Sequence, residues 1–90
     1  MTAERVSRIR AALERKFAPL QLEIFDDSAK HAGHAGAREG GHFRVRIVAE
    51  AFRGKTSIQR HRLVFAAVGE LMKSDIHALN IDARAPEENS

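Results

Sequence analysis

The chain of 90 residues contains no cysteine, no tryptophan and no tyrosine, and only two prolines. Without cysteine, the chain by itself can form no disulfide bond and offers no thiolate nucleophile and no sulfur ligand for zinc or an iron–sulfur cluster. Its chemistry must therefore come from carboxylates, backbone groups and the five histidines.

The sequence also lacks long apolar runs. None approaches the roughly 18 residues needed to cross a bilayer, and residues 1–10 are charged, unlike a signal peptide. We therefore expect a cytoplasmic protein without membrane contact. Hydrophobic residues make up 43% of the chain and charged residues 30%, as in ordinary folded domains. The length predicts a single domain over residues 1–90 with a thin core, frayed at residues 1–4 and 87–90.

Apolar residues at steps of three and four near the N-terminus predict an amphipathic helix. They are Val6, Ile9, Leu13 and Phe17. Thr2 is the expected N-cap. The helix should end at Ala18, because Pro19 disfavours helical geometry in the residue before it.

A capping-box spacing between Thr56 and Gln59 predicts a second helical region over residues 57–73. Its apolar face consists of Leu63, Val64, Ala67, Val68 and Leu71. The length leaves room for a break near His61, and Gly69 weakens the interior. We expect His61 to pack between this region and the sheet.

Three segments alternate apolar and polar residues with the period of two that is typical of a half-buried strand. The first begins at Leu20 and ends at Asp26, the second opens at His42, and the third spans residues 76–83. The residues of the second strand that we expect to face the core are Phe43, Val45, Ile47 and Ala49.

The order helix, strand, strand, helix, helix, strand predicts an α+β fold, a three-stranded mixed sheet with helices on one face. A right-handed crossover through the second helical region makes the second and third strands parallel. Parallel strands begin at the same end of a sheet, so His42 and His77 should lie at one end. Residues 27–41, with four glycines and both His31 and His34, lead into that end.

Histidines from remote segments thus converge, and neutral imidazole is a good ligand for zinc, iron and copper. A metal or cluster site is one interpretation. The other is structural: His77 shares parity with Leu79 and Ile81 and would be a core-edge side chain bonded to backbone. His31 and His34 would then be solvated. The residue pattern leaves both open.

Charge is segregated along the chain. Residues 44–62 hold six basic side chains and one acidic, whereas residues 74–90 hold one basic and four acidic. The candidate phosphate-binding residues, around a turn and a helix start, are Arg53, Gly54, Lys55, Arg60 and Arg62. Backbone amides and cations at a helix start favour phosphate, as in nucleic-acid binding. The alternative is a solvated basic face, because no exposed aromatic platform for bases is evident.

No catalytic constellation is evident in the sequence. No hydroxyl nucleophile has an obvious base partner, and the adjacent Asp26 and Asp27 would point to opposite faces of a strand. We therefore expect the protein not to be an enzyme.

Several motifs together resemble the BolA-like family, over the chain from about Val6 to Pro86. They are Asp27-Ser28 before His31 and His34, His42-Phe43-x-Val45, Phe52-x-Gly54-Lys55-x-Ser57-x-x-Arg60-His61-Arg62-Leu63-Val64, and Ile76-His77-Ala78-Leu79. The resemblance implies a fold similar to the class II KH domain, in agreement with the predicted order of elements.

The resemblance also implies a partner and a cofactor. BolA-like proteins associate with monothiol glutaredoxins and share a 2Fe-2S cluster, to which the glutaredoxin gives a cysteine and bound glutathione a second thiolate. The family's own ligands match His34 here, with His31 as substitute, and His77. The implied function is an adaptor in cluster assembly, trafficking or iron sensing. The isolated chain should carry no cofactor and be a monomer or a weak dimer.

A second function of another class is implied as well. Bacterial members of the family are described as transcriptional regulators, and the region suggested to contact DNA corresponds to Arg53, Lys55, Arg60 and Arg62. A DNA-binding regulator is therefore the alternative to the adaptor.

Overall fold

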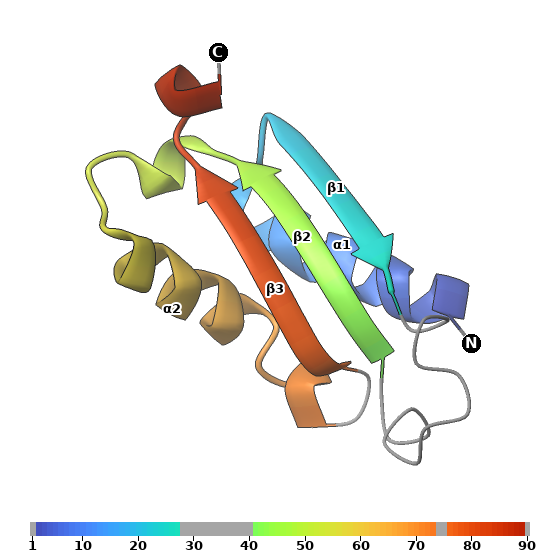
Figure 1. The fold of residues 1–90 in the computed structure, drawn as a ribbon. Coiled ribbons are helices and arrows are strands. Elements are labelled where there is room, and N and C mark those ends of the chain that lie inside the picture. Colours follow the sequence, from blue (N-terminus) through green and yellow to red (C-terminus); the bar gives the residue numbers. More distant parts are fainter. Residues whose placement is uncertain (1, 28–40, 74–75, 90) are drawn as a thin grey trace.

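The protein folds as a three-stranded sheet with helices on one face (Figure 1). The structure is a computed structural model that describes residues 2–27, 41–73 and 76–89. The helices and strands are α1 (Thr2–Phe17), β1 (Gln21–Asp26), β2 (Gly41–Val48), α2 (Ser57–Ala67) and β3 (Ile76–Arg84). Short 3-10 helices are η3 (Glu50–Phe52), η4 (Leu71–Lys73) and η5 (Pro86–Asn89).

The sheet has the order β1-β2-β3, with β1 antiparallel and β3 parallel to β2. The predicted α+β class, the mixed sheet and the parallel pairing through the α2 crossover are thus confirmed. The likeness to a class II KH domain stays a prediction. Among the described residues, no helix has the length and apolarity that a membrane span requires.

The core lies between the sheet and the two long helices. Alternate residues of β2 are buried, as the period of two predicts. Buried core residues are Ile9, Leu13 and Phe17 of α1, Phe43, Val45 and Ile47 of β2, Ala49, Phe52, and Val64 and Val68. The rings of Phe17 and Phe52 pack with centroids 5.0 Å apart. Leu20, at which the first strand was expected to begin, is 65% exposed, and β1 begins at Gln21.

The second helical region breaks later than expected. α2 ends at Ala67, and after a turn at residues 68–70 the chain forms η4, so the break lies around Gly69 and not near His61. Glycine is about 1 kcal/mol less favourable than alanine inside a helix, which explains the position of the break. The side chain of His61 is half-buried on α2.

The expected fraying of residues 1–4 and 87–90 stays a prediction. α1 begins at Thr2, whose expected role as N-cap stays a prediction, and the acidic residues Glu87 and Glu88 lie in η5. Ion pairs join η5 to the rest of the fold, between Glu87 and Arg53 and between Glu88 and Arg60.

Candidate functional site

One end of the sheet brings together the segments that carry the histidines. We call it the rim, formed by Asp27 after β1, by Gly41 and His42 of β2, and by Ile76 and Ala78 of β3. Gly41 is paired with Ile76, and the backbone N–H of Asp27 donates to the carbonyl of His42 at 2.7 Å. The predicted meeting of the two strand starts is therefore confirmed for the backbone.

The start of β3 contains an irregularity at the histidine. Gly41 pairs with Ile76 and His42 pairs with Ala78, so His77 is an extra residue without a counterpart on β2. Bulges of this kind disrupt the ladder locally, re-aim side chains and are frequent beside functional sites. The pattern that gave His77 the same parity as Leu79 therefore does not determine which way residue 77 faces.

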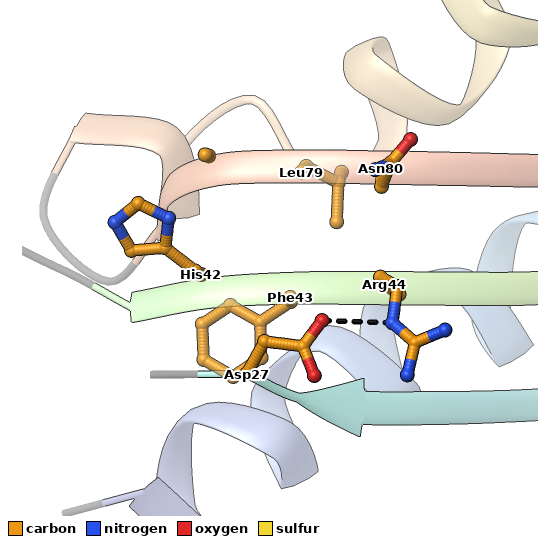
Figure 2. Close-up of a pocket in the computed structure, with 7 residues that line it drawn as sticks. Asp27, His42, Phe43, Arg44, Leu79 and Asn80 are labelled. Atoms are coloured by element: carbon orange, nitrogen blue, oxygen red, sulfur yellow. Dashed lines mark hydrogen bonds and ion pairs between the residues drawn. The ribbon is translucent and has the colours of Figure 1, made fainter. Parts of the chain in front are cut away.

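A shallow pocket opens at the rim on the face of the sheet away from the helices (Figure 2). Its volume is about 360 Å³. Its lining residues are Asp27, His42, Phe43, Arg44, Ala78, Leu79 and Asn80. The Arg44 Nε donates to Asp27 Oδ2 at 2.7 Å, and the guanidinium lies 4.8 Å from the centre of the Phe25 ring. These contacts fix the end of β1 against β2.

The predicted metal ligands are only partly within the described structure. His31 and His34 lie outside the described residues, and for His77 the structure describes the backbone alone. Within the described part of the chain, no group of three or more His, Asp or Glu side chains could hold a metal ion. The assignment of His77, His34 and His31 as ligands stays a prediction. Sequence reasoning missed His42 as a lining residue of the rim pocket, although its place at the start of the second strand was visible.

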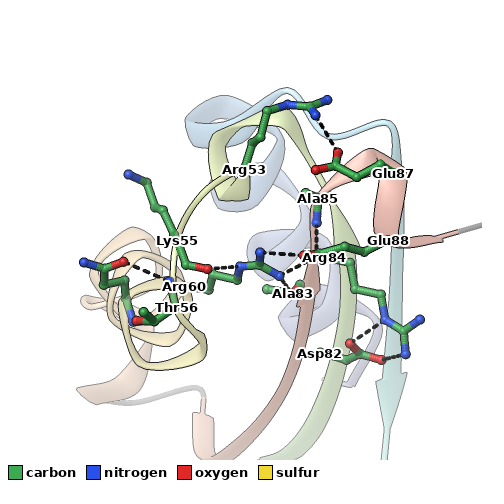
Figure 3. Close-up of polar contacts among 11 residues, drawn as sticks. Arg53, Lys55, Thr56, Arg60, Asp82, Ala83, Arg84, Ala85, Glu87 and Glu88 are labelled. Atoms are coloured by element: carbon green, nitrogen blue, oxygen red, sulfur yellow. Dashed lines mark hydrogen bonds and ion pairs between the residues drawn. The ribbon is translucent and has the colours of Figure 1, made fainter.

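Arg53 and Arg60 lie at the opposite end of the sheet, together with Glu87 and Glu88, and we call this set the arginine end. Arg53 binds both oxygens of Glu50 at 2.9 and 3.0 Å, and its Nη1 lies 2.7 Å from Glu87 Oε1. Arg60 binds both oxygens of Glu88 (Figure 3). Two of the predicted phosphate-binding cations are therefore engaged by carboxylates of this chain.

The hydrogen bonds from the arginines lower the pKa of the glutamates that they bind. The hydrogen bond from Arg60, and then the backbone N–H of Ala85, lower the pKa of Glu88 from 4.5 to about 2. The hydrogen bond from Arg53 lowers the pKa of Glu50. Both carboxylates are thus firmly ionised near neutral pH.

Lys55 and Arg62 behave differently from the two engaged arginines. Lys55 lies in the turn before α2 and Arg62 within α2; both are exposed, and neither has a carboxylate partner among the described residues. Gly54 has a φ of +75°, which positions the turn before the helix. The structure thus divides the predicted basic set into two engaged and two available cations.

The pairing of the C-terminal acids with the basic segment was not predicted. The signal was present in the segregated charge of residues 44–62 and 74–90. Nothing in the spacing along the chain, however, indicates which acid meets which arginine, because the partners are 28 positions apart for Arg60 and Glu88.

Comparisons with known proteins agree with the sequence motifs. The family model described as BolA-like protein matches residues 13–88. SufE-like protein 1, chloroplastic/mitochondrial, of Arabidopsis thaliana is 44% identical over 87 residues, which cover 90% of this chain and 24% of that protein. The DNA-binding transcriptional regulator BolA of Escherichia coli is 35% identical over 72 residues, covering 80% of this chain and 67% of the relative. The chain spans 24% to 56% of the lengths of the Arabidopsis and mammalian relatives.

Solved structures lead to the same assignment. The BolA domain of SufE1 from Arabidopsis thaliana superimposes with a TM-score of 0.83 at 46% identity, covering 93% of this chain and 94% of that one. The organelle names of two plant relatives differ from our expectation of the cytoplasm, which stays a prediction. With a family model over most of its length and a matching fold at high identity, this chain belongs to the BolA-like family.

Proposed function

We propose that this BolA-like domain is a non-enzymatic adaptor that binds a monothiol glutaredoxin through the rim and helps to hold a 2Fe-2S cluster there. The observation that carries the proposal is the common end of β2 and β3, at which His77 is the unpaired residue of an irregular ladder. Residues 28–40, with His31 and His34, connect Asp27 and Gly41 of that same end.

The chemistry of the donor set fits such a cluster. The chain has five histidines and no cysteine, so it can supply imidazole nitrogens but no sulfur. His77, with His34 or His31, would ligate one iron, and the thiolates would come from the glutaredoxin and glutathione. Replacement of thiolate by imidazole removes negative charge and raises the reduction potential of a bound cluster.

Residues of the rim would position these ligands. The Asp27–Arg44 ion pair and the bond from the Asp27 N–H to the His42 carbonyl hold together the two strand ends that residues 28–40 connect. His42 and Asn80 line the pocket beside them and offer hydrogen-bonding groups to a partner surface (Figure 2). This arrangement limits how far the two ends of the segment can separate.

The test is co-expression with a monothiol glutaredoxin, purification of the complex and measurement of its visible absorption. We expect His77→Ala to change or abolish the cluster spectrum, because one iron loses a ligand. His61→Ala is the matched control, since it removes a histidine of α2 that the proposal does not use. A spectrum that is the same in His77→Ala and wild type would refute the assignment.

The loop ligand can be identified in the same assay. If His34 is the ligand, His34→Ala changes the spectrum and His31→Ala does not; the reverse pattern assigns His31. If both single variants and the double variant keep the wild-type spectrum, neither His31 nor His34 is a ligand.

A DNA-binding regulator is the second candidate, in line with the name of the Escherichia coli relative. Lys55, before α2, and Arg62, within α2, favour it because both are exposed and lack carboxylate partners in the described part of the chain. Arg53 and Arg60 oppose it because Glu50, Glu87 and Glu88 already neutralise them.

Salt-dependent binding to a DNA duplex tests this candidate. Each phosphate contact that is lost lowers the salt slope by about one, so Lys55→Ala and Arg62→Ala should each do so. Arg53→Ala should have less effect, because its charge is already paired. Identical binding curves for the wild type and the double variant Lys55→Ala, Arg62→Ala would remove the candidate.

A further inference from the structure

Arg60 is held in a fixed orientation by the backbone. Its side chain is only 12% exposed, its Nε donates to the carbonyl of Lys55 at 2.9 Å, and its Nη1 donates to the carbonyl of Ala83 at 3.0 Å. The first carbonyl lies before α2 and the second in β3. The guanidinium plane is therefore set by two elements of the fold independently of any carboxylate.

The remaining donors of Arg60 converge with a backbone amide on one carboxylate. Glu88 Oε1 accepts from Arg60 Nη1 at 2.6 Å and from the N–H of Ala85 at 2.9 Å, and Oε2 accepts from Arg60 Nη2 at 3.0 Å (Figure 3). A two-pronged guanidinium together with a backbone N–H is a geometry that suits carboxylate and phosphate oxygens alike.

The Glu88 carboxylate, which accepts from these donors, is at the surface. The side chain of Glu88 is 44% exposed, in contrast to that of Arg60, and it belongs to the four-residue helix η5. The neighbouring Glu87 is bound to the exposed Arg53 at 2.7 Å. η5 is thus held at the arginine end by two carboxylates, each of which another anion could replace from the solvent side.

Loss of Glu88 from this place would remove the carboxylate that accepts from Arg60 Nη1, Arg60 Nη2 and the Ala85 N–H. These three donors would then face solvent in an arrangement already set by the backbone, open to another acceptor. An anion of matching shape is the simplest replacement, and Ala85 N–H would contribute to its binding.

We propose that Arg60 and the backbone N–H of Ala85 form an oxyanion-binding site, that Glu88 is its internal occupant, and that a phosphate group displaces Glu88 from it. The phosphate belongs either to a small phosphate compound or to a nucleic-acid backbone. The site lies at the arginine end, so the proposal does not depend on the cluster or on a glutaredoxin.

The experiment uses the full chain labelled with nitrogen-15 and titrated with inorganic phosphate at constant ionic strength. In Glu88→Ala, the signals of the Ala85 amide and of Arg60 Nε should shift at phosphate concentrations at least about ten-fold lower than in wild type, because no internal competitor has to be displaced. Glu23→Ala is the matched control. It removes an exposed carboxylate that pairs with Arg46, and it should titrate like wild type.

A short DNA duplex is the second probe and separates the two sources of phosphate. Tighter duplex binding by Glu88→Ala than by Glu23→Ala assigns a nucleic-acid ligand, whereas a response to inorganic phosphate alone assigns a small phosphate compound. Because the titration with inorganic phosphate contains no DNA, it tests the oxyanion site independently of the proposed DNA binding.

Several outcomes would overturn the proposal. Equal phosphate titrations of Glu88→Ala and wild type, or shifts that avoid Ala85 and Arg60, would mean that Glu88 only fastens η5. If Glu88→Ala does not fold, Glu88→Gln keeps the size of the side chain and lacks its charge. In Glu88→Gln the Ala85 and Arg60 signals should shift at lower phosphate concentrations than in wild type. An unchanged titration of this variant would also contradict the proposed oxyanion site.

Discussion

Two of the described residues have a positive φ, and one of them has a Cβ whereas the other is glycine. Ala18, the residue after α1, has a φ of 45°, and Gly54 before α2 has a φ of 75°. The left-handed region is unfavourable for a residue with a Cβ and accessible to glycine. Ala18 keeps this conformation because its N–H caps α1 by donating to the Glu14 carbonyl at 3.0 Å.

Substitution at these two positions should therefore change stability in opposite directions. We expect Ala18→Gly to raise the free energy of unfolding by about 1 kcal/mol and Gly54→Ala to lower it by about 1 kcal/mol, since only glycine avoids the cost of the Cβ. A Cβ on Gly54 would meet no atom within 4 Å, so the cost is conformational and not steric. Urea unfolding measures both changes.

The control is Gly69→Ala. A Cβ there would lie 3.5 and 3.6 Å from backbone oxygens, which is ordinary contact, and this residue is not among those with a positive φ. We expect little loss of stability. A loss as large as that of Gly54→Ala would show that φ is not the cause. Pro19 predicted the end of α1 from the sequence, but the left-handed φ of Ala18 depends on tertiary context.

Among the secondary-structure elements, α2 shows which features can be predicted from residues that are close in the sequence. The N–H of Gln59 donates to Thr56 Oγ1 at 3.2 Å, and the N–H of Thr56 donates to Gln59 Oε1 at 2.9 Å, so the predicted capping box is confirmed. A cap is readable because its partners lie three residues apart. The break in this helical region was placed too early, near His61, because the apolar face continues without interruption to Leu71, whereas α2 stops at Ala67 and the chain forms η4 at Leu71–Lys73.

Removal of the cap should destabilise the protein measurably. We expect Thr56→Ala to lower the free energy of unfolding by about 1 kcal/mol, because the N–H of Gln59 loses its acceptor. Ser57→Ala alters an exposed neighbouring hydroxyl that is not the cap, and it should change stability by less than about 0.5 kcal/mol. Equal losses in the two variants in urea unfolding would argue against the capping box as the source.

In the whole molecule, the fold brings the acidic η5 next to Arg53 and Arg60, although the sequence shows only that the two regions have opposite charge. Periodicity predicted the sheet and the meeting of β2 and β3 at the rim, because hydrophobic patterning and crossover handedness act on whole elements. It did not predict that η5 pairs with Arg53 and Arg60, because these contacts depend on where the chain goes after β3. The bulge at His77 was equally invisible, since it changes register and not composition.

The contact of Glu88 with Arg60 predicts a pH dependence of stability. The pKa of Glu88 is lowered from 4.5 to about 2 in the folded protein, so its contribution is present above the unfolded-state value and is lost as the pH falls through that interval. The difference in urea midpoint between wild type and Glu88→Gln should be full at neutral pH. It should shrink as the pH falls from 4.5 to about 2. A difference that stays constant over this range would contradict the pairing.

The two ends of the molecule have distinct roles in this account: the rim meets the glutaredoxin, and the arginine end binds oxyanions. Amide chemical shifts recorded while cluster-loaded glutaredoxin is added distinguish these two roles. We expect shifts or paramagnetic broadening at rim residues such as Asp27, His42 and Ala78, with the amides of Arg53 and Arg62 unchanged. Perturbation confined to the arginine end and α2, with the rim unaffected, would contradict this expectation.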